Sequence, residues 1–148
     1  MVNFKDIPPE LLIKELSNKL SKEIQEPKWV KEVKTGLHKE RGPNEANWYS
    51  IRAAALLRKV AINSPIGIER LASEYGGKVD RGSKAHHAGK GSRKVLRAAL
   101  QDLEKMGYIL KNKNGRSISS AGTKMLNAAA KAVSSELKER IPAMEKYI

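Results

Sequence analysis

Residues 78–119 read KVDRGSKAHHAGKGSRKVLRAALQDLEKMGYILKNKNGRSIS, and this stretch decides the fold. A basic, Gly-rich segment comes first, and Leu96, Leu100 and Leu103 then recur at helical spacing over residues 92–106. A hairpin pattern follows over residues 108–119, and a short helix is predicted upstream, over residues 66–74. Two helices followed by a hairpin predict a winged helix-turn-helix.

Basic charge is concentrated in the same stretch. Seven Lys or Arg lie between Lys78 and Arg97 against a single acid, Asp80, and the whole chain has a formal net charge of +13. Such a charge favours association with phosphate-rich surfaces. The alternative is a solvated surface that only aids solubility. Because a solvated surface normally mixes both signs, the imbalance favours contact with nucleic acid.

The rest of the chain predicts more helices. Leu12, Leu16, Leu20 and Ile24 recur every four residues after Pro8-Pro9, and a helix capped by Ser119 or Ser120 continues to Pro142. Residues 35–44 are predicted to be a loop. The chain is therefore predicted to be mainly α. It would have a winged helix-turn-helix core with extra N- and C-terminal helices and a small β-hairpin wing, as one domain over residues 1–148.

A helix predicted over residues 45–62 has two different faces. Tyr49, Leu56 and Val60 group on a face that should point to the core. Trp48, with Arg52, lies on the other face, where an exposed Trp normally needs a partner to cover it. We expect Trp48 either to stack on a base or to cap the core.

Four local predictions concern the basic segment, the second helix and the wing. Residues 78–90 are predicted to be a mobile loop that becomes ordered on contact, because this turn is longer than usual. Ser92 is predicted as the N-cap of the second helix, and Asn114-Gly115 as a turn with both residues at positive φ. The wing tip over residues 111–116 is either a plain polar turn or a contact site.

Catalytic and cofactor motifs are not found in the sequence. There is no Cys, and His38, His86 and His87 lack the spacing of a metal site. We expect no enzyme, metal or cofactor. No run of about 18 apolar residues and no signal-peptide pattern occurs, so we expect a cytoplasmic protein that does not enter membranes and is a monomer when isolated.

Several separated motifs resemble one family, the e-type small-subunit ribosomal protein nineteen of archaea and eukaryotes. The resemblance covers about residues 6–130. The motifs are, in order, Pro27-Lys28-Trp29-Val30, Lys39-Glu40, Glu45-Ala46-Asn47-Trp48-Tyr49 with Arg52-Ala53-Ala54, Tyr75-Gly76-Gly77, His87, Gly91-Ser92, Leu103-Glu104 and Gly115-Arg116 to Gly122. The chain departs from the family pattern at Ala85 and Ala88 in the basic segment, and mildly at Ile118-Ser119 in the wing.

The resemblance implies a place in the head of the small ribosomal subunit, binding to small-subunit rRNA beside neighbouring ribosomal proteins, and a role in subunit maturation. Family residues tied to function fall on Trp48, Arg52, Arg58 and Arg97. With the cations found above, the predicted RNA-binding residues are Trp48, Arg52, Arg58, Lys59, Lys78, Arg81, Lys84, His87, Lys90, Arg93, Lys94, Arg97, Lys111, Lys113 and Arg116.

Two other functions fit the same pattern. A winged-helix transcription regulator would read DNA through residues 92–106, but only Arg93, Arg97 and Gln101 form the outward row there. Such a regulator would not require the second basic face near Trp48, and it would usually dimerise. A winged helix that binds proteins and carries incidental charge is the third possibility.

Overall fold

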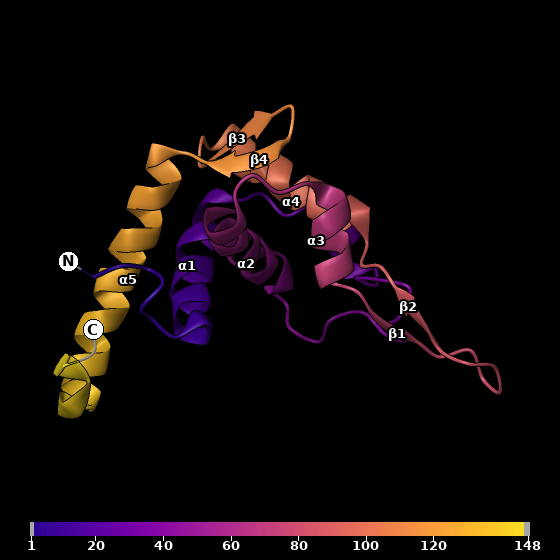
Figure 1. The fold of residues 1–148 in the computed structure, drawn as a ribbon, viewed down its shortest axis with the longest axis horizontal. Coiled ribbons are helices and arrows are strands. Elements are labelled where there is room, and N and C mark those ends of the chain that lie inside the picture. Colours follow the sequence, from indigo (N-terminus) through magenta and orange to yellow (C-terminus); the bar gives the residue numbers. More distant parts are fainter. Residues whose placement is uncertain (1, 147–148) are drawn as a thin grey trace.

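The computed structural model describes residues 2–146, which form α-helices and two small antiparallel sheets (Figure 1). The first helix, α1 (Pro9–Glu23), buries Leu12, Leu16 and Leu20, the stripe predicted from their spacing. A 3-10 turn, η1 (Lys28–Lys31), follows it. Next comes α2 (Trp48–Asn63), which begins three residues later than predicted and packs against α1. These two helices form one side of the core.

The winged helix-turn-helix is present as predicted. Its two arms are α3 (Ile68–Glu74) and α4 (Arg93–Lys105), and the wing is β3 (Ile109–Asn112) paired with β4 (Gly115–Ile118). Ile66 pairs with Arg116 through backbone bonds of 2.8 and 3.0 Å, so an isolated bridge joins the segment before α3 to the wing. The fold class predicted from the sequence, mainly α with a small hairpin, is confirmed.

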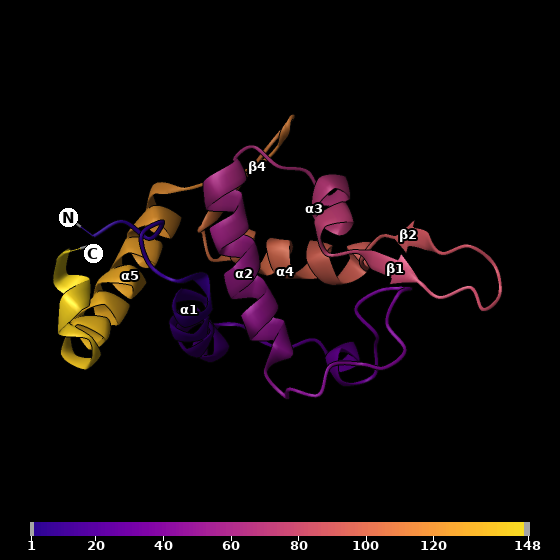
Figure 2. The same cartoon turned by 60° about the horizontal axis from the view of Figure 1, so that its bottom comes forward.

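The predicted mobile loop over residues 78–90 is instead a β-hairpin. Strand β1 (Gly77–Val79) pairs antiparallel with β2 (His87–Gly89), and residues 80–86 join them. Figures 1 and 2 show this hairpin extending away from the helices. The loop prediction was wrong because these strands are short and rich in Gly and Lys, without the alternation that marks a half-buried strand.

The wing turn also differs from the prediction. Asn112 pairs with Gly115, so Lys113 and Asn114 are the two turn residues. Gly115 has φ +132, but within the described residues no residue other than glycine has positive φ, which excludes the predicted conformation for Asn114. A side chain at residue 115 would also approach the Ile66 carbonyl to 2.7 Å. Glycine at position 115 therefore allows the backbone of Ile66 to approach the wing closely.

The last helix, α5 (Ser120–Arg140), begins at a formed cap. Ser119 accepts a hydrogen bond from the Gly122 amide at 3.1 Å, as one of the two predicted caps. Leu126, Ala129 and Val133 are buried on the face that packs against α1. After it, η2 (Pro142–Lys146) ends the described chain. Ser92 is the N-cap of α4, but its side chain makes no cap bond.

The loop before α2 is attached to the start of α4. The Ser92 amide donates to the Thr35 carbonyl at 2.8 Å, and Gly36 pairs with Gly91 in an isolated bridge. His38 packs against Gly36 and Gly77, where an added Cβ would come within 2.7 Å of its ring. The same loop therefore packs at the root of the β1–β2 hairpin.

Candidate nucleic-acid interface

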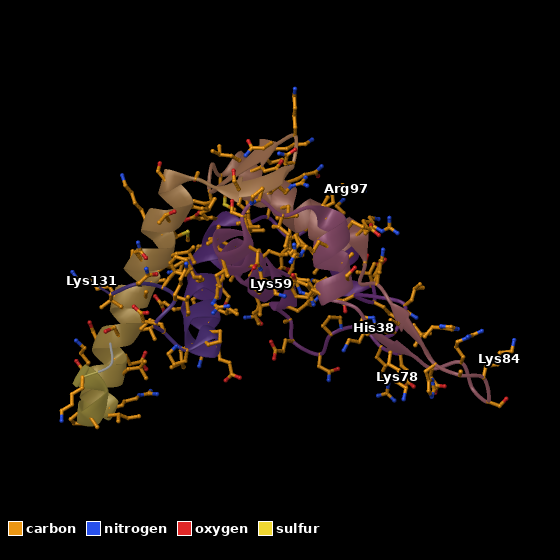
Figure 3. All side chains as sticks on the ribbon, viewed as in Figure 1. His38, Lys59, Lys78, Lys84, Arg97 and Lys131 are labelled. Carbon is orange, nitrogen blue, oxygen red and sulfur yellow. The ribbon has the colours of Figure 1, made fainter. Side chains whose placement is uncertain are left out.

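The β1–β2 hairpin presents cations without a covering element. Its predicted contact residues are all exposed: Lys78, Arg81, Lys84 and His87. The acid of this segment, Asp80, is occupied within the turn, because its Oδ1 accepts from the Gly82 amide at 2.9 Å and lies 3.9 Å from His86 Nδ1. Figure 3 shows Lys78 and Lys84 along the extended arm. The arm is therefore a positively charged projection.

Helix α4 continues the positive surface. Its buried face holds Val95, Leu96 and Leu100, while the predicted outward row of Arg93, Arg97 and Gln101 is exposed. Arg97 forms no ion pair within residues 2–146. The helical periodicity therefore predicted correctly which face of α4 is exposed. A guanidinium in this position is free to donate two parallel hydrogen bonds to a phosphate.

Two cations of this surface meet an acid of α3. Glu69 pairs with Lys90 and with Arg93, the latter at 3.2 Å. The hydrogen bond from Lys90 is the main cause that lowers the pKa of Glu69, and Arg93 adds to it. All three side chains are about half exposed. Exposed ion pairs contribute little to stability, so Lys90 and Arg93 remain available to a phosphate.

On α2, the predicted outward cations are half-buried. Arg52 lies over the Tyr75 ring at 4.3 Å, and Lys59 lies over the same ring at 4.7 Å while pairing with Glu74. The Nε of Arg58 is buried and has no partner in the described residues. Burial lowers the pKa of Arg52, with Tyr75 acting in the opposite direction, and burial raises the pKa of Tyr75. A guanidinium nevertheless stays protonated at neutral pH.

Trp48 does not lie on the outward face, and that part of the prediction was wrong. Its side chain is only 8% exposed, and its Nε1 donates to the Val30 carbonyl at 3.2 Å. Its ring also packs edge-on against Tyr49 with centroids 5.9 Å apart. The helical spacing could not predict that Trp48 is covered, because the covering segment, η1, lies outside the helix. The alternative interpretation, in which Trp48 caps the core, fits this position.

The wing has two kinds of cation. Lys111 and Lys113 are exposed as predicted, whereas Arg116 is buried. Arg116 Nε donates to Glu104 Oε1 at 2.6 Å, so its side chain is held inside the protein. The prediction placed Arg116 at the turn, but the register puts it in β4 facing α4. Lys94, on α4, is exposed and lies 5.2 Å from the Trp29 ring centre.

The predicted residues therefore form groups rather than one site. The hairpin and the start of α4 bring together Lys78, Arg81, Lys84, His87, Lys90, Arg93 and Arg97. The wing lysines and the α2 cations lie apart from these, and Figure 3 labels Lys59 well away from Lys84. Sequence reasoning missed Tyr75, whose ring lies under both Arg52 and Lys59. The signal that could have found it is an aromatic residue at the end of α3, where no core position was expected.

Two further properties bear on function. In the part of the chain that the structure describes, no group of three or more His, Asp or Glu side chains could hold a metal ion. Within the same residues, no helix has the length and apolar character needed to cross a membrane.

Comparison with known sequences identifies the family. The family model of ribosomal protein S19e matches residues 3–136 of the chain. The chain belongs to the ribosomal protein S19e family. Membership makes it a structural constituent of the small ribosomal subunit in the cytoplasm, and it confirms the resemblance drawn from the separated motifs.

Relatives in this family cover the chain almost completely. Small ribosomal subunit protein eS19 of Thermoplasma acidophilum is 49% identical, and that of Aeropyrum pernix is 39% identical, each with 100% of both chains covered. Small ribosomal subunit protein eS19B of Schizosaccharomyces pombe is 39% identical over 87% of this chain and 92% of its own length. The family thus includes archaeal and eukaryotic proteins. Its members are ribosomal proteins.

Proposed function

We propose that the chain binds small-subunit rRNA through the β1–β2 hairpin and the outward row of α4. On this basis it would occupy the head of the subunit, contact neighbouring ribosomal proteins and support subunit maturation. The position in the head rests on the family resemblance alone. We further propose that residues 1–148 act as one domain and that the isolated protein is a monomer.

The observation that carries this proposal is the continuity of exposed cations from Lys78 to Arg97. Each Lys or Arg that meets a phosphate releases condensed counterions, so binding should weaken steeply with salt. The hairpin extends away from the helices, and Oδ1 of its acid, Asp80, accepts a hydrogen bond from the Gly82 amide within the turn. Backbone contacts of this kind carry little base information, so specificity would come from the shape of the folded RNA.

The test is incorporation of an Arg97→Glu variant into small subunits. Arg97 is exposed, so the thermal unfolding midpoint should stay nearly unchanged while incorporation fails. Lys131→Glu is the matched control, because Lys131 is equally exposed but lies on α5, at the other end of the molecule (Figure 3). An Arg97→Glu protein that assembles like the control would refute the role of α4.

Sedimentation distinguishes the alternative function, a DNA-binding regulator, from the ribosomal function. The ribosomal function predicts that the protein cofractionates with small subunits at low salt. A regulator would instead remain a free dimer bound to duplex DNA. The second basic group on α2 and the ribosomal names of the relatives favour the ribosomal function.

A further inference from the structure

A cleft beside the start of α4 gathers cations from outside the β1–β2 hairpin and the outward row of α4. It has a volume of about 490 Å³ and lies between the loop before α2, helix α2 itself and the end of α3. Its charged and polar lining includes Lys39, Arg41, Glu45, Arg52 and Tyr75. Figure 2 shows this loop running from the root of the hairpin to the start of α2. Anchoring of Thr35 to Ser92 holds the loop in place.

Arg52 is the first sign that the cleft takes an anion. Its guanidinium packs over the Tyr75 ring and makes no hydrogen bond or ion pair within residues 2–146. The side chain is half-buried in the cleft wall. A partly desolvated charge without a carboxylate is costly for the folded protein. An anionic ligand with several acceptor oxygens would compensate that cost.

Tyr75 supplies an independent sign. Its hydroxyl is buried and has no hydrogen-bond partner among the described residues, although buried hydroxyls are normally bonded. Tyr75 lines the same cleft as Arg52. The wall of one cleft therefore holds a cation without a carboxylate partner, and a buried hydroxyl without a hydrogen bond belongs to the same wall. Both groups can donate to an oxygen.

The charges around the cleft also favour an anionic ligand. Lys39, Arg41 and Arg52 are opposed only by Glu45 among the residues that line it. Lys39, Arg41 and Glu45 are exposed at the mouth, where a ligand would enter. The open cleft suits one group of a long polymer better than a small enclosed molecule. An Arg guanidinium can donate two parallel hydrogen bonds to two oxygens of one phosphate, whereas the ammonium of a Lys does not match them in this way.

We propose that this cleft, lined by Lys39, Arg41, Arg52 and Tyr75, binds a phosphate group of an RNA backbone. The proposal rests on the proposed function, because it needs an RNA held by the hairpin and α4. It adds a contact site from the loop before α2, whose cations were not among the predicted contacts. Arg52 and the Tyr75 hydroxyl hold the phosphate, and Lys39 and Arg41 close over it.

The test measures binding of the full-length protein to a small-subunit rRNA transcript over a range of salt concentrations. Each phosphate contact that is lost reduces the slope of log K against log salt by roughly 0.7 to 0.9. Since both residues act on the same phosphate, Arg41→Gln and Arg52→Gln should each lower the slope by up to that amount and weaken binding roughly fivefold. Glu45→Gln should strengthen binding, since it removes the one acid of the cleft. Lys131→Gln, on α5, should behave as the wild type.

The Arg41 and Glu45 variants keep the test decisive if Arg52→Gln proves unstable, because both residues are exposed. Tyr75→Phe removes only the hydroxyl and should weaken binding without changing the salt slope. Titration with inorganic phosphate, followed by NMR of the loop amides, distinguishes the source of the ligand. Shifts in those amides together with an unchanged RNA slope in Arg41→Gln would identify a free-phosphate site and overturn the proposal.

The two proposals fail differently. If Arg97→Gln reduces the salt slope but Arg41→Gln and Arg52→Gln do not, the cleft proposal is overturned and the proposed function stands. If the wild type does not bind the transcript at all, the proposed function fails and the cleft proposal with it. A reduced slope in all three variants, with the opposite effect of Glu45→Gln, supports both.

Discussion

Arg116 Nε donates to Oε1 of Glu104 at 2.6 Å, and this pair joins the wing to the second arm of the helix-turn-helix. The side chain of Arg116 is 10% exposed and that of Glu104 is 22% exposed. The Arg116 backbone also pairs with Ile66, so one residue links β4 to α4 and to the segment before α3. Arg116, which was predicted to contact RNA, therefore stabilises the fold by joining these segments.

Arg116→Gln should destabilise the fold by about 2 kcal/mol, because it leaves a mostly buried carboxylate without its cation. Urea unfolding measures this change. Lys113→Gln, on the exposed turn of the same hairpin, should change stability by less than about 0.5 kcal/mol. If Arg116→Gln proved as stable as the wild type, the structural role of the pair would be refuted.

Trp48→Phe should cost about 1 to 2 kcal/mol of stability, since the Val30 carbonyl loses its buried donor. Thermal or urea unfolding provides the measurement. Affinity for rRNA should stay at the wild-type value, because the indole is covered by η1. Leu37→Ala is a suitable control for loss of apolar surface, as Leu37 is 81% exposed and should not affect stability. A stable Trp48→Phe protein with weakened RNA binding would restore the stacking role.

Alkaline pH should destabilise the protein partly through Tyr49. Burial, followed by the hydrogen bond to Asp102 at 2.8 Å, raises the pKa of Tyr49 far above its usual value of 10.0. The unfolded chain therefore loses this proton near pH 10 while the folded chain retains it, so stability is complete below that pH and falls above it. Unfolding free energies at about pH 8 to 11 test this.

Tyr49→Phe removes one such phenol and should flatten the fall above pH 10 by up to about 1.4 kcal/mol per pH unit. It should also lower stability at neutral pH by about 1 kcal/mol through the lost bond to Asp102. Equal slopes for Tyr49→Phe and the wild type above pH 10 would contradict the assignment.

Gly77→Ala should disturb the root of the β1–β2 hairpin. A Cβ at residue 77 would lie 2.7 Å from Cδ2 of His38, and that ring is held on its other side by Gly36. Overpacking of this kind costs about 1 to 3 kcal/mol, and hydrogen exchange of the hairpin amides should quicken. The double variant with His38→Ala should recover much of the loss.

Gly67→Ala is the matched control for that substitution. A Cβ at residue 67 meets no heavy atom of the described residues within 4 Å, and its φ of -93 suits any residue. Because Gly67 is the N-cap of α3, where Ala is less favourable than Gly, this variant should lose about 0.5 kcal/mol, which is less than the loss expected for Gly77→Ala. Equal losses in Gly67→Ala and Gly77→Ala would remove the steric explanation.

Much of the fold follows from local patterns in the sequence. Leu12, Leu16 and Leu20 are buried where their spacing of four predicted, and the outward row of α4 is exposed as predicted. Ser119 caps α5 with its own side chain. In each case the information lies within one or two helical turns, which is the range over which periodicity and capping act.

The features that could not be predicted all depend on distant segments. Trp48 is covered by Val30 from η1, and Arg116 is neutralised by Glu104 from α4. A helical projection treats a helix as if it stood alone, so it cannot include a carbonyl 18 residues away. The β1–β2 strands are stabilised by pairing with each other, and their residue types carry no strong preference.

The bond from Ser92 to the Thr35 carbonyl, with the Gly36 to Gly91 bridge, sets a limit on how the protein can be dissected. A recombinant fragment of residues 48–119 would contain every helix and strand of the winged module. It would also cut away the acceptor of the amide of Ser92, the N-cap of α4, and the backbone that flanks the hairpin. The smallest transplantable unit therefore begins upstream of Thr35, although nothing before Trp48 belongs to the winged-helix pattern itself.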